Sequence, residues 1–323
     1  MKRNFILIII SVLSIIYSDS FSQSCCGGSI YDVAVLPLNK KALFNVGFNY
    51  ENYMGVWNEL GVWNKIANTS YQMKPVMSAG YRFNKQLQAG LSIPFVYNRN
   101  ELPGLRPSGS GIGDITISGR YEFLHEFQVY EMNGKNKTDK KTPYLAMTFG
   151  MVLPTGKSDE SASTEAEITG KGAFATTVGV SALKSIIRNK FQTALDLSWQ
   201  HNFEKTYTSV YGEPVTNSFT KKLGDKFNYG LSFNYLINDW NAVSLSAGGF
   251  LQSAYKIDGT EGHNSDEHVL NFTTSYTYYP NLNIRITPSF KWYIPTNNIG
   301  KNTTGSYLFA LNLVYYIENN DDY

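Results

Sequence analysis

Residues 111–123 of the chain read GIGDITISGRYEF. From residue 115 to residue 123, every second position is apolar, glycine or aromatic, and the positions between them are polar or charged. Successive side chains of a β-strand point to opposite faces, so the stretch predicts a strand with one apolar face and one charged face. A soluble β-sandwich produces the same alternation. The stretch alone therefore leaves open whether its apolar face meets a protein core or lipid.

Similar strand signals recur along the rest of the chain. They cover residues 42–50, 73–83, 87–95, 145–153, 174–180, 191–199, 227–235, 243–251, 270–278, 284–292 and 307–317. Together with residues 115–123 they make about twelve strands, most of them about ten residues long, the length that crosses a bilayer as a tilted strand.

The predicted links between the strands alternate in length. Short turns follow the second, sixth, eighth and tenth strands and longer loops follow the odd-numbered ones, while the link at 125–141 is longer than its position predicts. Outer-membrane barrels have short periplasmic turns and long external loops. The sequence therefore predicts an all-β fold, a transmembrane antiparallel up-and-down β-barrel over residues 41–317 with a C-terminal tail at 318–323. A secreted two-domain β-protein is the alternative.

The N-terminus has the pattern of a secretory signal. Lys2 and Arg3 precede an apolar run at 5–17, and Ser20-Phe21-Ser22 forms a small-x-small cleavage site. We expect residues 1–22 to be a signal peptide read by the Sec pathway, and residues 23–40 to be a periplasmic leader or a plug. No other stretch approaches the ~20 apolar residues of a spanning helix. The predicted location is the outer membrane of a Gram-negative bacterium.

Composition excludes some partners and leaves one feature open. The formal net charge is +2, and Lys and Arg do not cluster as a nucleic-acid surface requires. Cys25 and Cys26 are the only cysteines and are adjacent, so they cannot form a disulfide framework. Three interpretations of this pair are open: a vicinal disulfide or inert pair, a lipid anchor on Cys25, and capture of a thiophilic metal. No cofactor is predicted.

The inward faces of the predicted strands carry charges of both signs. The candidates are Glu51, Arg82, Asp114, Arg120, Glu122, Asp196, Arg285 and Lys291. Charges kept in a wall can pair and brace it, or they can line a permeation path and set its selectivity. Because neither sign dominates, the sequence does not predict a strict cation or anion pore.

One loop motif raises an enzymatic alternative. His263-Asn264-Ser265 is followed shortly by His268, and a Ser–His pair on a barrel wall can hydrolyse lipid. The motif lies in a loop and lacks an orienting third residue, so a solvated polar loop is the favoured interpretation and the protein is not expected to be an enzyme. His263 and His268 are also weak metal candidates.

Three short segments carry a family resemblance. GIGDI at 111–115, RYEF at 120–123 and LPTGK at 153–157 resemble a family of outer-membrane barrels named for a meta-pathway of phenol degradation and grouped with hydrophobic-compound transporters. The resemblance implies passive uptake of small hydrophobic or aromatic solutes. We therefore expect a monomeric channel that contacts outer-membrane lipid and small solutes. A lipid hydrolase, or a structural barrel whose surface loops bind a partner, are the alternatives.

Overall fold

The structure is a computed structural model that describes residues 36–37, 39–100, 107–123, 129–132, 135–138, 143–187 and 190–318. The expected signal peptide, the Cys25-Cys26 pair and most of the expected leader lie outside these residues. Within them, no helix is both long enough and apolar enough to cross a membrane.

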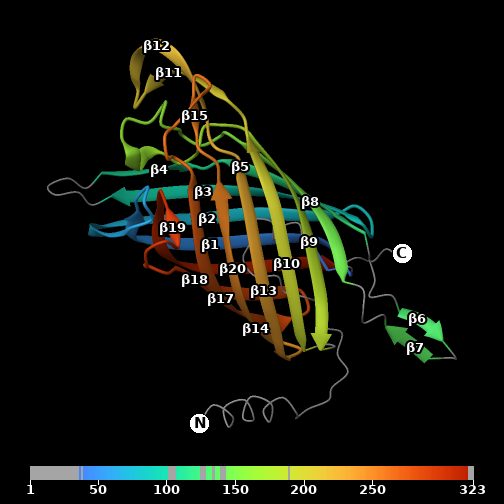
Figure 1. Ribbon diagram of the computed structural model, residues 1–323. Coiled ribbons are helices and arrows are strands. Elements are labelled where there is room, and N and C mark those ends of the chain that lie inside the picture. The colour runs from blue at the N-terminus through green and yellow to red at the C-terminus, as the bar shows by residue number, and fades with distance from the viewer. Residues whose placement is uncertain are drawn as a thin grey trace, which may run out of the picture.

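The strands close into one antiparallel barrel (Figure 1). The main sheet has fourteen strands; counting β4 and β5 as one broken strand and leaving out the two-residue β19 gives the predicted twelve. Pairing of β14 with β17, at the two ends of the strand order, closes the cylinder. The barrel strands are β1 (Lys40–Trp57), β2 (Trp63–Arg82), β3 (Leu87–Asn100), β4 (Ser108–Ile112), β5 (Ile115–Glu122), β8 (Tyr144–Leu153), β9 (Ala175–Ile187), β10 (Phe191–Asn202), β13 (Lys226–Asn238), β14 (Asn241–Gln252), β17 (Glu267–Asn281), β18 (Ile284–Tyr293) and β20 (Thr303–Glu318), with β19 at Gly300–Lys301.

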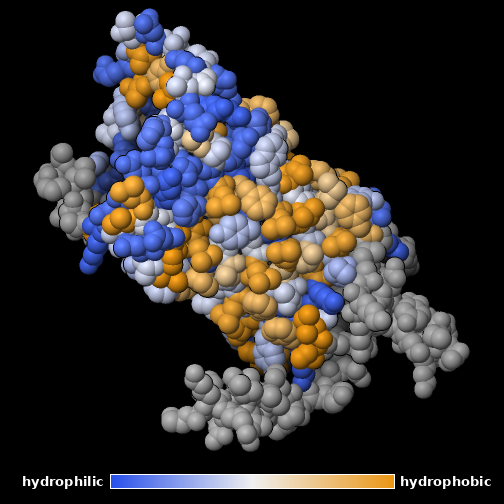
Figure 2. All heavy atoms as spheres, in the orientation of Figure 1, coloured by the Kyte–Doolittle hydropathy of each residue, from blue (hydrophilic) through white to orange (hydrophobic). Residues whose placement is uncertain are grey.

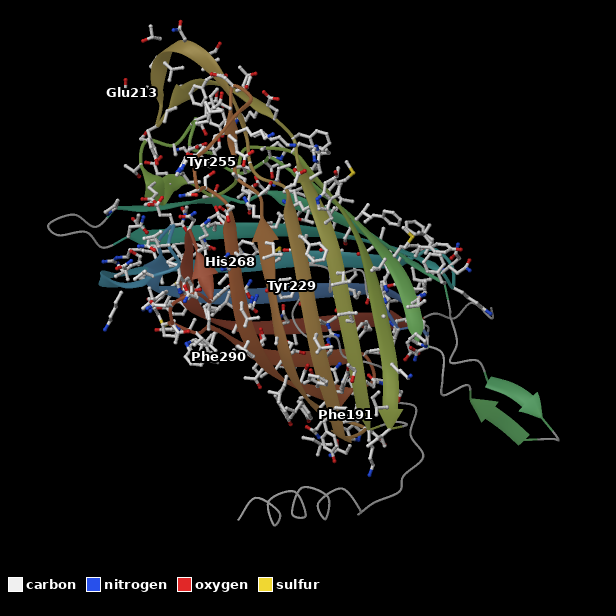
Figure 3. All side chains as sticks on the ribbon, in the orientation of Figure 1. Phe191, Glu213, Tyr229, Tyr255, His268 and Phe290 are labelled. Atoms are coloured by element: carbon white, nitrogen blue, oxygen red, sulfur yellow. The ribbon has the colours of Figure 1, made fainter. Side chains whose placement is uncertain are left out.

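The two ends of the barrel differ. β1 begins and β20 ends at one end, and the short connections β2–β3, β9–β10, β13–β14 and β17–β18 lie there too. We call this the inner end, because outer-membrane barrels keep their short turns on the periplasmic side. At the opposite, outer end the chain builds a further sheet from β11 (Lys205–Val210), β12 (Glu213–Lys222), β15 (Lys256–Ile257) and β16 (Thr260–Glu261). Figure 3 shows Phe191 and Glu213 at these opposite ends.

The stretch quoted first contains a break in the wall. β4 pairs only with β3, and β5 resumes the ladder after Gly113 and Asp114. The amide of Gly113 donates to the carbonyl of Pro94, and a Cβ added at Gly113 would lie 3.0 Å from the Pro94 ring. The glycine therefore permits the close approach at which one strand is divided into two.

The strand expectations hold, but two regions are more ordered than predicted. The link between the first two expected strands, 42–50 and 73–83, is mostly strand: Trp57 of β1 pairs with Trp63 of β2, and their rings lie 4.5 Å apart. The sequence has no clean two-residue period there because the register shifts between Tyr53 and Gly55. The link at 125–141 contains a hairpin of β6 (Val129–Met132) and β7 (Lys135–Thr138), which accounts for its unexpected length.

The prolines inside strands are tolerated locally. Pro75 lies in β2, Pro94 in β3 and Pro288 in β18. Proline cannot donate to a ladder. Accordingly, the β17–β18 pairing is interrupted between Ser275 and Tyr278, opposite Pro288.

Candidate functional site

The outer surface of the barrel is apolar. Figure 2 shows hydrophobic side chains gathered over the barrel wall and hydrophilic ones over the outer end. Phe44, Val46 and Phe48 of β1 are 45–57% exposed, and Tyr315, Leu313 and Leu311 of β20 face the same way because they pair with them. Exposed apolar patches of this size are unstable in water. The barrel is therefore an outer-membrane barrel whose apolar wall faces the hydrocarbon.

Aromatic rings border this surface near the outer end. Three neighbouring strands carry Tyr50, Tyr71 and Tyr97. The ring centroids of Tyr50 and Tyr71 are 5.7 Å apart, and those of Tyr71 and Tyr97 are 6.3 Å apart. Tyrosine suits the membrane interface, because its ring is apolar and its hydroxyl is polar. Near the inner end, Tyr81 and Phe83 make a second ring contact at 5.1 Å. The two borders match the aromatic girdles of outer-membrane barrels.

The opposite face of the same strands is polar and points into the lumen. Asp196 of β10 pairs across the ladder with Gly230 of β13. Although both face inward, Asp196 is exposed, and a Cβ added at Gly230 would meet no atom within 4 Å. The middle of the barrel is therefore hollow and open to water rather than filled by side chains.

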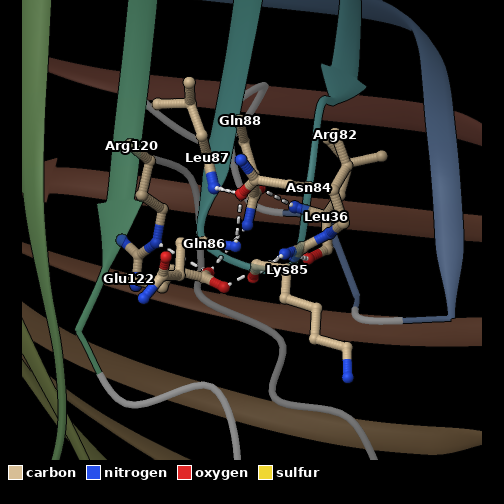
Figure 4. A network of polar contacts seen from close by, with 9 residues as sticks. All are labelled: Leu36, Arg82, Asn84, Lys85, Gln86, Leu87, Gln88, Arg120 and Glu122. Carbon is tan, nitrogen blue, oxygen red and sulfur yellow. Dashed lines mark hydrogen bonds and ion pairs between the residues drawn. The ribbon is translucent and has the colours of Figure 1, made fainter. Parts of the chain in front are cut away.

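Three of the candidate lumen residues meet near the inner end (Figure 4). Glu122 accepts from the guanidinium groups of Arg82 and Arg120, each at 3.2 Å. The amide of Gln88 donates to the same carboxylate at 2.7 Å. Arg82, Gln88 and Arg120 form one cross-strand row over β2, β3 and β5, and the Arg82 side chain is only 1% exposed. We call these four residues the inner cluster.

The inner cluster holds a piece of the N-terminal segment. The amide of Leu36 donates to Oε1 of Gln88 at 2.6 Å, and its carbonyl accepts from Arg82. The Leu36 side chain is 2% exposed and belongs to an apolar cluster with Leu43, Val314 and Tyr316. Both backbone polar groups of Leu36 are thus satisfied by the wall, so Leu36 is anchored inside the inner end of the barrel.

The long β8–β9 loop, residues 154–174, folds into the barrel from the outer end. The inward-facing Asn98 of β3 donates to the carbonyls of Ala166, within a short 3-10 helix, η2 (Glu165–Glu167), and of Ile168, which directly follows that helix. Asp114 accepts from the amides of Gly156 and Lys171, which holds the loop against the break between β4 and β5. Motif residues that lie far apart in sequence therefore form one joint.

The same loop is also tied to the external sheet. Lys205 pairs with Glu160 at 2.8 Å, and Lys221 pairs with Asp159 at 3.0 Å. The hydrogen bond from Lys205 and the amide of Thr208 lower the pKa of Glu160. The loop thus bridges from β3 to β11 and β12 and narrows the outer part of the lumen.

A second group of charges lies around this loop. Lys171 has Glu267, Asp114 and Lys74 as its charged neighbours, Lys226 has Lys171, Glu267 and Lys291, and Lys291 has Glu51 and Lys74. We call the space bordered by these seven residues the outer chamber. Its members are Glu51, Lys74, Asp114, Lys171, Lys226, Glu267 and Lys291.

The remaining candidates take separate places. Asp196 lies opposite Ser181 in the β9–β10 pairing and has Arg120 as a charged neighbour. Arg285 lies on the inward row of β18, with its guanidinium 5.7 Å from the Tyr316 ring. All eight candidates therefore lie at inward positions or at the β4–β5 joint.

Several lumen residues were not singled out from sequence. Lys74 and Gln88 occupy inward positions of predicted strands, and Lys226 directly precedes one, so strict alternation would have identified them. Lys171 has no such signal, because it lies in a loop whose path depends on Asp114.

The Ser–His motif does not form a catalytic arrangement. The Ser265 hydroxyl donates to the carbonyl of Gly262 at 2.9 Å instead of to a histidine. Figure 3 places His268 on the barrel wall, within β17. Across the residues that the structure describes, no three His, Cys, Asp or Glu side chains come together as metal ligands. Cys25 and Cys26 fall outside those residues.

Comparisons with known proteins agree with this architecture. Residues 76–313 match the family described as "Putative MetA-pathway of phenol degradation". The fold is similar to that of the COG4313 outer membrane channel from Pseudomonas putida F1, with a TM-score of 0.68, 13% sequence identity, and coverage of 91% of this chain and 100% of that one. The translocator domain of the autotransporter NalP from Neisseria meningitidis aligns more loosely, with a TM-score of 0.47, 10% identity, and coverage of 85% and 88%.

Proposed function

Since the chain belongs to the family described as "Putative MetA-pathway of phenol degradation", we propose that it is an outer-membrane channel or passive transporter for small hydrophobic or aromatic solutes. One observation carries this proposal: the inward-facing Asp196 is exposed beside open space at Gly230, inside a barrel whose outside is apolar. A closed wall around a hydrated lumen provides a path across the membrane.

The relatives support the same function. The Pseudomonas putida protein that shares this fold is described as an outer membrane channel. In the proposed function, the eight inward candidates border the solute path, the apolar wall contacts outer-membrane lipid, and one chain acts as a monomer because β14 and β17 close the barrel without a second copy. The protein carries solutes without catalysing a reaction.

We further propose that residues 23–40 act as a plug at the inner end. The support is the anchoring of Leu36, whose amide and carbonyl are both bound by Gln88 and Arg82. Leu36, which is held in this way at the inner end, occupies space that a solute leaving the lumen must cross. Displacing it therefore opens the path to the periplasm.

Planar-bilayer conductance tests both proposals. The mature protein is compared with a variant that lacks residues 23–38, which keeps Asn39 and the start of β1. We expect channel events in both proteins and a larger unit conductance in the shortened one. Absence of conductance in both proteins contradicts the channel function, and equal unit conductance contradicts the plug alone.

Liposome swelling tests the solute class. Vesicles that contain the shortened barrel are exposed to iso-osmotic sugars, amino acids and small aromatic compounds. We expect faster entry of the aromatic compounds than of sugars of similar mass. Equal rates that follow size alone would indicate an unselective pore.

A further inference from the structure

The outer chamber contains four ammonium groups that have no carboxylate within ion-pair distance. Lys74, Lys171, Lys226 and Lys291 come from β2, the β8–β9 loop, β13 and β18, and none of them forms an ion pair among the residues that the structure describes. The strand register places Lys226 in one inward row with Glu267, and Lys291 in one inward row with Glu51. The lysines also have charged neighbours in common. Four like charges held together are unfavourable unless an anion joins them.

Lys171 shows that this space is enclosed and still open to water. Its side chain is exposed. Desolvation by the surrounding protein nevertheless lowers its pKa, although Glu267 and Asp114 act in the opposite direction. The loop that carries Lys171 is held by the inward-facing Asn98 and by Asp114, so this exposed group lies inside the lumen rather than on an open surface. A bound anion would therefore be screened less there than at the protein surface.

Two of the three carboxylates in the outer chamber accept hydrogen bonds from uncharged groups. Glu51 accepts from the hydroxyl of Ser306 at 2.5 Å. Asp114 accepts from two backbone amides, at 3.0 and 2.7 Å. Hydrogen bonds of this kind satisfy a carboxylate without neutralising a lysine. Glu267 is not buried and has no such hydrogen bond among the described residues, so four ammonium groups face one carboxylate that is free of neutral donors.

Aromatic side chains share the inward rows with these lysines. The Nζ of Lys226 lies 3.5 Å from the centre of the Phe250 ring, across the β13–β14 pair. Tyr293 follows Lys291 at the next inward position of β18, and it has Glu51 as a charged neighbour. The chamber therefore combines cationic groups with flat apolar surfaces.

We propose that the outer chamber is a binding station for a small organic monocarboxylate with a ring-sized apolar body. The carboxylate lies among Lys171, Lys226 and Lys291, and the body contacts Phe250 and Tyr293. Four lysines against three carboxylates leave one net positive charge (4 − 3 = +1), which favours a singly charged carboxylate over a doubly charged phosphate. This inference rests on the proposed channel function and specifies the charge of its solute.

Equilibrium binding tests the proposal without requiring transport. The mature protein in detergent is titrated calorimetrically with benzoate, benzyl alcohol and inorganic phosphate. We expect benzoate to bind and the other two to bind at least about tenfold more weakly, since a charge-assisted hydrogen bond is worth about that factor. Equal binding of benzyl alcohol, or no binding of benzoate, would overturn the proposal.

Two variants locate the site. Lys171→Gln and Lys226→Gln are each expected to weaken benzoate binding about tenfold. Lys256→Gln is the matched control, because Lys256 is exposed on β15 of the external sheet, and it should leave binding unchanged. Barrel migration on an unheated gel confirms folding of each variant. Unchanged benzoate affinity in the two folded lumen variants would refute the assignment.

Bilayer measurements separate this inference from the channel function. Under a salt gradient, the reversal potential of the wild-type protein should indicate preference for chloride over potassium, and benzoate should reduce the current. Benzoate binding without any conductance would contradict the channel function and leave the binding station standing. Conductance without anion preference and without benzoate binding would contradict the binding station alone.

Discussion

The inner cluster and the outer chamber both place charges inside the barrel, but they treat them in opposite ways. In the inner cluster, Glu122 joins Arg82 and Arg120, and these side chains are between 1% and 7% exposed. In the outer chamber, the four lysines lack ion-pair partners among the described residues and remain accessible to lumen water. Buried charges persist only when they are paired, whereas hydrated ones can stay available. The inner cluster therefore braces the wall and anchors Leu36, and the outer chamber is suited to solutes.

The largest expected effect breaks the inner cluster. Glu122→Ala should lower the free energy of unfolding by about 3–5 kcal/mol, because it leaves two buried guanidinium groups without their carboxylate. Urea unfolding in lipid vesicles measures this change. Lys291→Gln in the outer chamber is the contrasting variant and should cost less than about 1 kcal/mol. Similar costs for the two variants would contradict the difference between the regions.

The next effect displaces the loop that shapes the outer chamber. In Gly170→Ala, the new Cβ would lie 2.2 Å from Oδ1 of Asp114 and 2.8 Å from the Cα of Gly156, so the loop must move away from the β4–β5 joint. We expect a stability loss of about 1–3 kcal/mol and larger current fluctuations in bilayers. Gly230→Ala is the control, because its Cβ meets nothing within 4 Å and should change neither property.

An effect of similar size on stability distinguishes the anchoring of Leu36 from the bracing of the wall. Gln88→Leu removes the acceptor for the Leu36 amide and one donor to Glu122, but it leaves both arginines paired. We expect the conductance of this variant to move towards that of the shortened protein, with a stability loss of about 1–3 kcal/mol from the unpaired amide. Wild-type conductance in Gln88→Leu would mean that Leu36 is held by its apolar contacts instead.

The smallest expected effect is a change in current fluctuations at low pH. The folded-state pKa of Glu160 is lowered, so its pairing with Lys205 stabilises the loop above the ordinary glutamate value of 4.5 and is lost as pH falls through the lower folded value. Current fluctuations should therefore rise when bilayer pH is taken below this range. Glu160→Gln should show the same fluctuations already at neutral pH. If Glu160→Gln shows no extra current fluctuations at neutral pH and responds to acid as the wild-type protein does, another carboxylate causes the effect.

The sequence predicted the wall more completely than the site. Alternation over residues 115–123 and the eleven similar segments was sufficient for the strand count, because the two-residue period follows from local backbone geometry. The same parity assigned Arg82, Arg120 and Glu122 to one face. It could not show that Gln88 and Leu36 join them, since those contacts depend on cross-strand register and on where the N-terminal segment lies.

The strand pattern and the barrel class were thus predicted from sequence, the first because it depends on the order of neighbouring residues and the second because short and long links alternate. Tertiary structure decided the rest. The break at Gly113 and Asp114 captures the β8–β9 loop and brings Lys171 into the lumen beside Lys226 and Glu267. Pairing or separation of charges depends on distances between strands that are far apart in the chain. No local pattern encodes those distances. Only the tertiary structure therefore distinguishes the inner cluster, where the charges are paired, from the outer chamber, where the lysines are not.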